Sequence, residues 1–432
     1  MDLSVQTLAD ADLDSPELVG IAVPMHTAMR LAVPVARALR ARRGTDIRIV
    51  LFGLYAPLCG PALEPGLVDA VIGGEYEGAL VRAANGDDDS RTIVLDRLHF
   101  PIPARDLLPP LHVYTTLLID GEARLTGYVE ATRGCVHRCR HCPVPAVYDG
   151  RIRVWQRDIL VEDVARLWND GMRHLTYGDP DFLNAVPHAL AVARAVHQRC
   201  PDLTFDITTK VEHILEHPEV IAELRDLGLL FLVSAVESTS ASVLEILDKG
   251  HSATDVVTAL RICRSAGVTF RPSLLPFTPW STLQDQVDLL DFIADNDLID
   301  NVDPVQLSIR LLVPPGSLLL ARPEMREHLH GYDADGFSHI WQHPDPAMDM
   351  LQAEIAALVA VDADRGAAPR STHAAIRRLT ARDTGASGLP WSNAGRELPP
   401  PRGATPRLSE PWFCCAEPTT AQLAVAGVGI GV

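Results

Sequence analysis

The chain has 432 residues, which is too long for one ordinary core, so we expect two or three domains. Hydrophobic residues make up 47% and charged residues 22% of the sequence, as in water-soluble globular proteins. The formal net charge of -18 argues against a nucleic-acid partner, because phosphate backbones are bound by positive surfaces.

The first 20 residues are acidic and lack a basic stretch followed by an apolar run, so we expect no signal peptide. No stretch reaches the roughly 18 to 20 uninterrupted apolar residues of a membrane span. We therefore expect a cytoplasmic protein without a membrane partner, in which grouped cysteines serve as ligands or catalysts. Cys59, Cys200 and Cys263 stand alone in apolar or helical contexts and are expected to be small buried side chains.

Residues 1–95 predict a small α/β unit. Strands that alternate with helices favour a parallel sheet with helices on its faces, as in Rossmann-like folds. Residues 96–124 begin with a proline-rich stretch without periodicity and are expected to form an ordered linker. The elements expected in the first unit are strands at 19–24, 46–53 and 67–74 and an amphipathic helix at 28–44.

Residues 125–315 show a longer and more regular alternation of strands and helices. Six β/α steps are fewer than the eight of a closed barrel, so we expect a partial, open barrel. Residues 316–432 form a C-terminal extension with one expected helix at 348–366 and a proline-rich irregular stretch. The strands expected in the barrel are 125–134, 172–179, 203–210, 229–238, 268–277 and 304–314.

Three cysteines, Cys135, Cys139 and Cys142, follow the first of these strands in the spacing C-x3-C-x2-C. This places them at the carboxyl edge of the barrel, where active sites of parallel β/α folds gather. Soft thiolates select zinc or iron–sulfur centres. A closed zinc site needs a fourth ligand, which His137 or His141 can supply, so a non-enzymatic zinc or iron–sulfur module remains an alternative. A cluster held by three cysteines instead leaves one iron open, as a catalytic centre requires.

The motif and the barrel resemble the radical SAM superfamily, whose CxxxCxxC signature is matched by Cys135, Cys139 and Cys142. The resemblance implies a [4Fe-4S] cluster whose open iron is chelated by S-adenosylmethionine (SAM). Reductive cleavage of SAM would give a 5'-deoxyadenosyl radical that acts on an unidentified small-molecule or peptide substrate. The resemblance also implies an electron donor such as flavodoxin or ferredoxin. His141 stands where the family often has an aromatic residue, and its imidazole would pack against the adenine.

The same resemblance assigns SAM-binding roles to residues that follow the strands. A Gly-Asp-Pro stretch replaces the family's Gly-Gly-Glu-like segment for the SAM amino group, and other positions match ribose and carboxylate contacts. From the residues alone, the alternatives are an ordinary Asp-Pro turn, an acidic residue at a helix start and structural salt bridges. The assigned residues are Gly178, Asp179, Pro180, Ser234, Glu237, Lys210 and Arg271.

The N-terminal unit resembles the cobalamin-binding domain of cobalamin-dependent radical SAM enzymes. The match lies in the late strand-turn-helix, at Gly73, Gly74, Glu75 and Glu77. The axial-ligand pattern D-x-H-x-x-G is missing, and only His26 remains in its place. Two interpretations follow: a cobalamin-dependent radical SAM methyltransferase or rearrangement enzyme, or a degenerate domain that only shapes the substrate pocket.

Residues 413–418, with the sequence FCCAEP, resemble the tail of the CUAEP/CCAEP-tail radical SAM proteins, some of which carry selenocysteine at the position of Cys415. Selenocysteine is usually chosen for redox or nucleophilic power, because it stays ionised where a thiol is protonated. Adjacent cysteines can close only a strained, easily reduced disulfide. We therefore expect the tail to fold over the barrel mouth and Cys414 and Cys415 to act there as catalytic or redox-active thiols.

Overall fold

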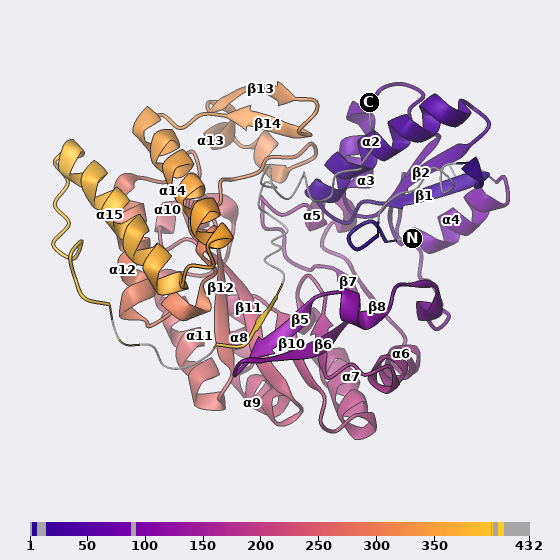
Figure 1. The fold of residues 1–432 in the computed structure, drawn as a ribbon, viewed down its shortest axis with the longest axis horizontal. Coiled ribbons are helices and arrows are strands. Elements are labelled where there is room, and N and C mark those ends of the chain that lie inside the picture. The colour runs from indigo at the N-terminus through magenta and orange to yellow at the C-terminus, as the bar shows by residue number, and fades with distance from the viewer. Residues whose placement is uncertain (1, 7–13, 88–91, 399, 401–404, 410–432) are drawn as a thin grey trace.

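The computed structural model describes residues 2–6, 14–87, 92–398, 400 and 405–409 (Figure 1). Cys414, Cys415 and the rest of the FCCAEP tail lie outside these residues. The N-terminal α/β unit, indigo in Figure 1, stands beside a larger curled sheet that is covered by helices on its outer face. The mixed α/β class expected from the sequence is confirmed.

The N-terminal unit is a parallel sheet in the order β1-β2-β3-β4. Its first helix buries Met29, Ala36 and Leu39 against the sheet and ends at Gly44, whose φ of 55° favours glycine. Short hydrophobic strands between such helices give the Rossmann-like pattern. The elements are β1 (Leu18–Ala22), α2 (His26–Arg43), β2 (Arg48–Phe52), α3 (Ala56–Cys59), β3 (Ala70–Gly74), α4 (Glu77–Ala84) and β4 (Ile93–Val94).

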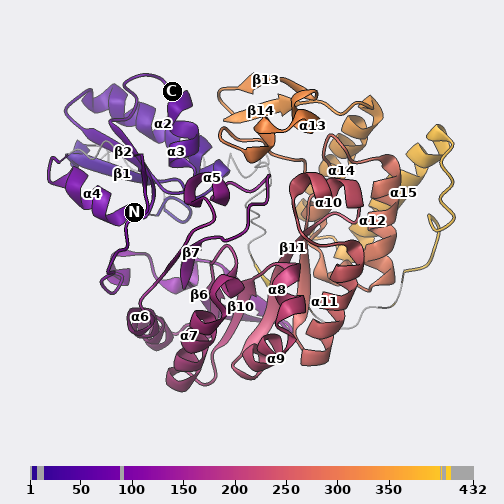
Figure 2. The ribbon, with the colours of Figure 1, turned by 180° about the vertical axis from the view of Figure 1, so that it is seen from behind.

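The second sheet has the order β12-β11-β10-β9-β6-β5-β15. The five strands from β6 to β12 in this order are parallel, and they curl into the expected open barrel (Figure 2). These strands are β6 (Glu122–Val129), β9 (His174–Tyr177), β10 (Thr204–Thr208), β11 (Leu229–Glu237) and β12 (Thr269–Leu274). The helices that cover them are α6 (Arg157–Asn169), α7 (Val186–Arg199), α8 (Val211–Glu216), α9 (Pro218–Asp226), α10 (Ala241–Leu247), α11 (Ala253–Ala266) and α12 (Leu283–Asp295).

The prediction of a sixth strand at 304–314 is wrong. A 3-10 helix occupies Pro304–Ser308, and one parallel bridge between Phe277 and Arg310 is all that remains of the strand. The side chain of Gln306 accepts a hydrogen bond of 2.9 Å from the backbone N–H of Leu274, at the end of β12. This side chain therefore satisfies a donor that a sixth strand would have paired.

The sequence analysis also missed elements at the edges. Strand β5 (Thr116–Ile119) pairs antiparallel with β6, and β15 (Arg407–Leu408) pairs antiparallel with β5. These two antiparallel strands form the edge of the sheet next to β6. The C-terminal extension holds the hairpin β13 (Leu329–Asp333) and β14 (Ser338–Trp341) and the helices α13 (Pro323–Arg326), α14 (Pro346–Asp364) and α15 (Pro369–Ser387).

The two units share a hydrophobic core where they meet. The core of the N-terminal unit continues into α5 (Val144–Tyr148), which follows the cysteine motif, and Phe337 from the C-terminal hairpin packs into it. Cys135 and Cys142 also pack against this core. The N-terminal unit therefore lies directly against the three-cysteine loop. Within the described part of the chain, no helix has the length and apolar character that a membrane span requires.

Candidate functional site

The three-cysteine loop is held at both ends by backbone geometry. It begins at the end of β7 (Thr132–Gly134), which pairs with β8 (Ile152–Val154). Gly134 has a φ of 78°, and an added Cβ would lie 2.2 Å from the carbonyl oxygen of Arg151, so this position requires glycine. Further along, the N–H of Arg140 bonds to the carbonyl of Leu247 at the end of α10. The fold therefore fixes the loop at the carboxyl edge of the barrel.

The three sulfurs are not grouped as the ligands of a single metal ion would be. Cys135, Cys139 and Cys142 form no disulfide among the described residues. Among the residues that the structure describes, the groups of three or more ligands that lie within 4.8 Å of one another include none of these cysteines. One tetrahedral zinc ion would hold thiolates about 3.8 Å apart, given Zn–S bonds of about 2.3 Å. Thiolates bound to separate irons of a [4Fe-4S] cluster stand farther apart than those on one zinc ion.

The two histidines proposed as a fourth zinc ligand are engaged elsewhere. His141 Nε2 lies 3.2 Å from Glu237 Oε1, and His137 Nε2 lies 3.0 Å from His213 Nε2. Neither histidine therefore completes a Cys3His zinc site with the three cysteines in this structure. Burial raises the pKa of Cys135 to about 11, so metal binding at this thiol must displace a proton.

A buried ion pair stands behind the loop. Glu237, at the end of β11, accepts a hydrogen bond of 3.3 Å from Lys249, and both side chains are at most 5% exposed. Burial alone would raise the pKa of Glu237, but Lys249 and His141 lower it to about 2. Burial likewise disfavours the charged Lys249, whereas Glu237, Cys139 and Cys142 raise its pKa. Lys249, which the sequence analysis missed, therefore supplies a positive charge near Cys139 and Cys142.

The Gly-Asp-Pro stretch after β9 is only partly available to a ligand. The carboxylate of Asp179 is buried and accepts hydrogen bonds from the N–H of Ala131 and the hydroxyl of Thr132. Burial raises the pKa of Asp179 to about 7, against the effect of these two donors. Pro180 is exposed. Asp179 thus ties the end of β9 to the segment that enters the cysteine loop.

Gly178 lies under an aromatic ring. An added Cβ at this position would lie 2.0 Å from the hydroxyl oxygen of Tyr128 on β6. The glycine therefore makes room for the Tyr128 side chain where the backbone turns out of β9. The sequence offered a ligand-binding reason for this glycine, and the structure adds a steric one.

The remaining residues that the sequence predicts to bind SAM have different environments in the structure. Ser234 on β11 is fully buried, and its hydroxyl has no hydrogen-bond partner among the described residues. Lys210 forms an ion pair with Glu212. Arg271 donates to Asp303 at 2.7 Å and to the carbonyl of Pro406 at 3.3 Å, so its guanidinium is occupied by the protein itself. The structure therefore groups His141 and Glu237 with the loop, while Arg271 holds the segment before β15.

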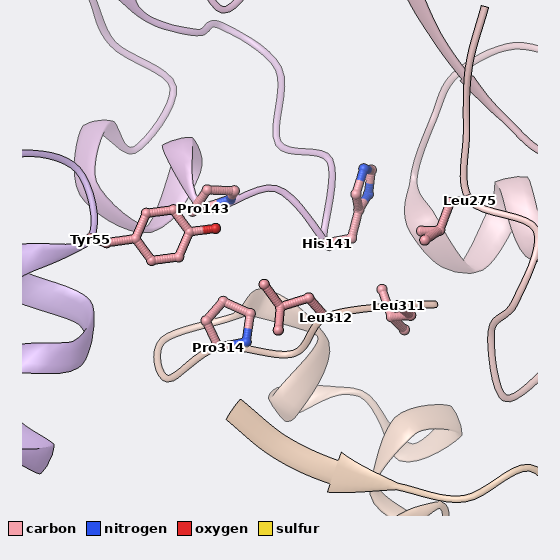
Figure 3. A pocket seen from close by; sticks show the side chains of 7 residues that line it. All are labelled: Tyr55, His141, Pro143, Leu275, Leu311, Leu312 and Pro314. Atoms are coloured by element: carbon pink, nitrogen blue, oxygen red, sulfur yellow. The ribbon is translucent and has the colours of Figure 1, made fainter. Parts of the chain in front are cut away.

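A small cavity lies where the two units meet the loop (Figure 3). Its volume is about 10 Å³, enough for one water molecule. It lies between Tyr55 of the N-terminal unit and His141 of the loop, as Figure 3 shows. The lining residues are Tyr55, His141, Pro143, Leu275, Leu311, Leu312 and Pro314.

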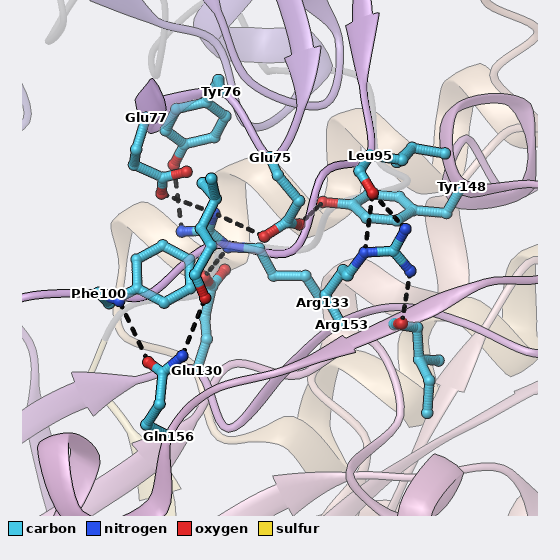
Figure 4. Close-up of polar contacts among 12 residues, drawn as sticks. Glu75, Tyr76, Glu77, Leu95, Phe100, Glu130, Arg133, Tyr148, Arg153 and Gln156 are labelled. Carbon is cyan, nitrogen blue, oxygen red and sulfur yellow. Dashed lines mark hydrogen bonds and ion pairs between the residues drawn. The ribbon is translucent and has the colours of Figure 1, made fainter. Parts of the chain in front are cut away.

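Arg133 joins the two units directly before the motif (Figure 4). Its guanidinium donates to Glu77 of α4 at 2.6 Å and to Glu130 at 2.7 Å. It also lies over the rings of Tyr76 and Trp155, at 5.0 and 5.1 Å from their centroids. Glu77, predicted as part of a cobalamin-binding turn, thus contacts the strand that leads into the cysteine loop.

His26, the only remnant of the axial-ligand pattern, lies inside the N-terminal core. It is 2% exposed, its two ring nitrogens have no hydrogen-bond partner in the described chain, and its ring meets that of Tyr55 edge-on at 6.0 Å. Burial lowers its pKa. His26 therefore packs as a neutral core side chain in this structure.

Comparison with known proteins agrees with this geometry. Residues 129–293 match the radical SAM superfamily. The chain is 24% identical over 310 residues to the bacteriochlorophyllide d C-8(2)-methyltransferase of Chlorobaculum tepidum, a match that covers 67% of this chain and 64% of that protein. The chain thus spans somewhat less than two thirds of the length of this relative.

Two solved structures are similar in fold over most of this chain. The cobalamin-dependent S-adenosylmethionine radical enzyme OxsB, with aqua-cobalamin bound, matches with a TM-score of 0.61 and 14% identity over 79% of this chain and 58% of that chain. The radical SAM methyltransferase TsrM from Kitasatospora setae, with tryptophan substrate and a SAM analog bound, matches with a TM-score of 0.57 and 14% identity over 80% of this chain and 78% of that chain. The residues that match the radical SAM superfamily, 129–293, include the three-cysteine loop and the strands β9 to β12 of the partial barrel.

Proposed function

We propose that this chain is a radical SAM enzyme in which Cys135, Cys139 and Cys142 hold a [4Fe-4S] cluster. The observation that carries the proposal is the C-x3-C-x2-C loop, whose three cysteines lie at the carboxyl edge of the barrel, within the residues that match the radical SAM superfamily. When bound, the cluster and SAM together supply a 5'-deoxyadenosyl radical for hydrogen abstraction.

The chain's own residues would provide the surroundings for this chemistry. The unpartnered hydroxyl of Ser234 offers a hydrogen bond to a bound ligand, and His141 presents its ring beside the cavity. The ionised pair of Glu237 and Lys249 places fixed charges behind the loop, where they need no reorganisation. Gly178, Asp179, Pro180 and Lys210 remain proposed contacts of SAM, and Arg271 is a proposed contact only if its ion pair with Asp303 opens.

The proposed substrate is a small molecule or a peptide. The electron that reduces the cluster is proposed to come from a donor such as flavodoxin or ferredoxin. Cys414 and Cys415 are proposed as redox-active thiols of the same reaction. A Cys415→Ala variant is expected to cleave SAM but to lose product formation. Full product formation with normal SAM cleavage in this variant would contradict a role for the tail.

Anaerobic reconstitution with iron and sulfide, followed by dithionite and SAM, tests the central claim. We expect about four irons per chain and release of 5'-deoxyadenosine. Replacing any one of Cys135, Cys139 and Cys142 by alanine should abolish both, whereas Cys200→Ala, at a buried cysteine of the barrel core, should retain both. A wild-type chain that forms no 5'-deoxyadenosine, or a cluster indifferent to the three replacements, overturns the proposal.

A cobalamin-dependent radical SAM methyltransferase is a second candidate. The N-terminal unit lies against the cysteine loop, and OxsB with bound aqua-cobalamin shares the overall fold. The cavity beside Tyr55, with a volume of about 10 Å³, does not itself hold a corrin ring, and His26 is buried in the N-terminal core. We therefore derive no step through cobalamin.

Reconstitution with hydroxocobalamin decides this candidate. Retention of cobalamin through gel filtration, with an unchanged amount in His26→Ala, would support binding without a histidine ligand. A chain that retains no cobalamin while it cleaves SAM favours the degenerate domain that only shapes the pocket.

A further inference from the structure

A second group of ligand-type side chains lies beside the cysteine loop, outside the three thiols. It consists of His137 from the loop, Asp181 after β9 and His213 from α8. Three elements that are distant in sequence thus converge at one edge of the barrel. His213 and Asp181 were not singled out by the sequence, because neither stands in a recognisable ligand spacing.

The three donor atoms form a triangle of the right size for one metal ion. His137 Nε2 and His213 Nε2 are 3.0 Å apart, His213 Nε2 and Asp181 Oδ2 are 3.3 Å apart, and His137 Nε2 and Asp181 Oδ2 are 4.0 Å apart. The point equidistant from the three atoms lies about 2.0 Å from each of them, which equals ordinary Zn–N and Zn–O bond lengths.

The carboxylate is oriented with one oxygen left for a ligand. Asp181 is 1% exposed, and its Oδ1 accepts hydrogen bonds from Thr209 Oγ1 at 2.8 Å and from the N–H of Leu183 at 3.1 Å. Its Oδ2 is buried, has no hydrogen-bond partner among the described residues and faces both imidazoles. A buried carboxyl oxygen without a hydrogen-bond partner is costly, and a cation bound there would satisfy it.

Carboxylates lie near the second ring nitrogen of each imidazole, beyond hydrogen-bond distance. His137 Nδ1 lies 3.6 Å from Glu212 Oε2, and His213 Nδ1 lies 3.7 Å from Glu216 Oε2. His213 Nδ1 has no hydrogen-bond partner among the described residues, and Glu212 Oε2 forms an ion pair with Lys210, which directly precedes α8. On metal binding, a carboxylate that closes on the second ring nitrogen would fix the tautomer that points Nε2 at the metal.

We propose that His137, Asp181 and His213 form a mononuclear site for a divalent transition-metal ion, separate from the cysteine cluster. Two imidazoles and one carboxylate suit zinc or ferrous iron and leave a position open for a further ligand. The ion would tie the cysteine loop to the ends of β9 and β10. This inference does not depend on SAM cleavage, because its measurements are metal content and metal coordination.

Zinc binding to the cluster-loaded full chain tests the site. The chain is dialysed anaerobically at a fixed free zinc concentration, and zinc and iron per chain are measured by mass spectrometry. We expect one zinc in the wild type and in His197→Ala, a matched control on α7. Asp181→Asn and His213→Ala should lose the zinc and keep their iron.

Two further variants separate this site from its competitors. His213→Cys should regain zinc with one Zn–S distance of about 2.3 Å in X-ray absorption, whereas the wild type should show only nitrogen and oxygen neighbours at about 2.0 to 2.2 Å. His217→Ala tests the neighbouring group of His213, Glu216 and His217, and should keep its zinc. Zinc with thiolate neighbours in the wild type, no zinc at all, or loss of zinc in His217→Ala alone would overturn the proposal.

Discussion

Lys249 donates a hydrogen bond of 3.3 Å to Glu237 in the interior of the protein, directly behind the three-cysteine loop. The two residues come from the turn after α10 and from the end of β11. Because Glu237 has a φ of 63° and sits at an irregularity of the strand register, its carboxylate is directed by local backbone geometry as well as by its partners.

This pair predicts strong destabilisation when one partner is removed. Lys249→Met would leave the Glu237 carboxylate buried beside His141 alone, at a cost of about 3 to 5 kcal/mol. The double variant Lys249→Met with Glu237→Gln should recover part of this loss, because no charge is then left unpaired. The midpoint of urea denaturation of each chain measures the effect, and equal losses in the single and double variants would contradict it.

The junction at Arg133 predicts a second, independent loss of stability. Arg133→Ala would remove contacts with Glu77 and Glu130 and leave both carboxylates without their main partner. We expect a loss of about 3 kcal/mol and faster hydrogen exchange in α4.

Arg138 provides the control for this prediction. Arg138 lies in the three-cysteine loop that follows β7 and pairs with Asp149, but both side chains are at least 60% exposed. Arg138→Ala should therefore cost at most about 0.5 kcal/mol. Similar losses in Arg133→Ala and Arg138→Ala would show that the Arg133 contacts do not join the units.

Asp179 predicts a pH dependence of stability. Its pKa of about 7 in the folded chain lies above the usual aspartate value of 3.8, because the side chain is buried. The folded state therefore holds the proton more tightly, and this contribution to stability is complete below about pH 4 and is lost as the pH rises through 7. In Asp179→Asn this loss is absent. Between pH 5 and 8, the stability of the variant relative to the wild type should rise by about 3 kcal/mol.

Urea denaturation of both chains across this pH range checks the prediction. The variant keeps an acceptor for the N–H of Ala131, so the two chains differ mainly in the titrating proton. A constant difference between them would mean that the hydrogen bonds from Ala131 and Thr132 keep Asp179 ionised throughout.

The close approach of Gly178 to Tyr128 predicts that substitutions at these two positions have coupled effects on stability. Gly178→Ala places a methyl group where the Tyr128 ring lies, so the ring must move, at a cost of about 1 to 3 kcal/mol. In a Tyr128→Ala background the same substitution should cost less than about 0.5 kcal/mol, because the space is then empty. A double-mutant cycle on the urea midpoints measures this coupling, and equal costs in both backgrounds would contradict a steric role of the glycine.

Local sequence determined the elements and the cysteine loop. Strands such as β10 and helices such as α11 follow from hydrophobic periodicity and capping residues, which act over a few positions. The spacing of Cys135, Cys139 and Cys142 likewise depends only on neighbours in the chain. The expected strand at 304–314 was wrong because the side chain of Gln306, rather than a backbone strand, satisfies the N–H of Leu274.

Only the tertiary structure decided what surrounds the loop. Glu237 meets Lys249, and Asp181 meets His137 and His213, because the carboxyl ends of parallel strands converge at one edge of the barrel. No spacing along the chain encodes such meetings, since each partner comes from a different element. Burial then sets their charge states, because a carboxylate or an ammonium group in the interior depends on its nearest partner rather than on water.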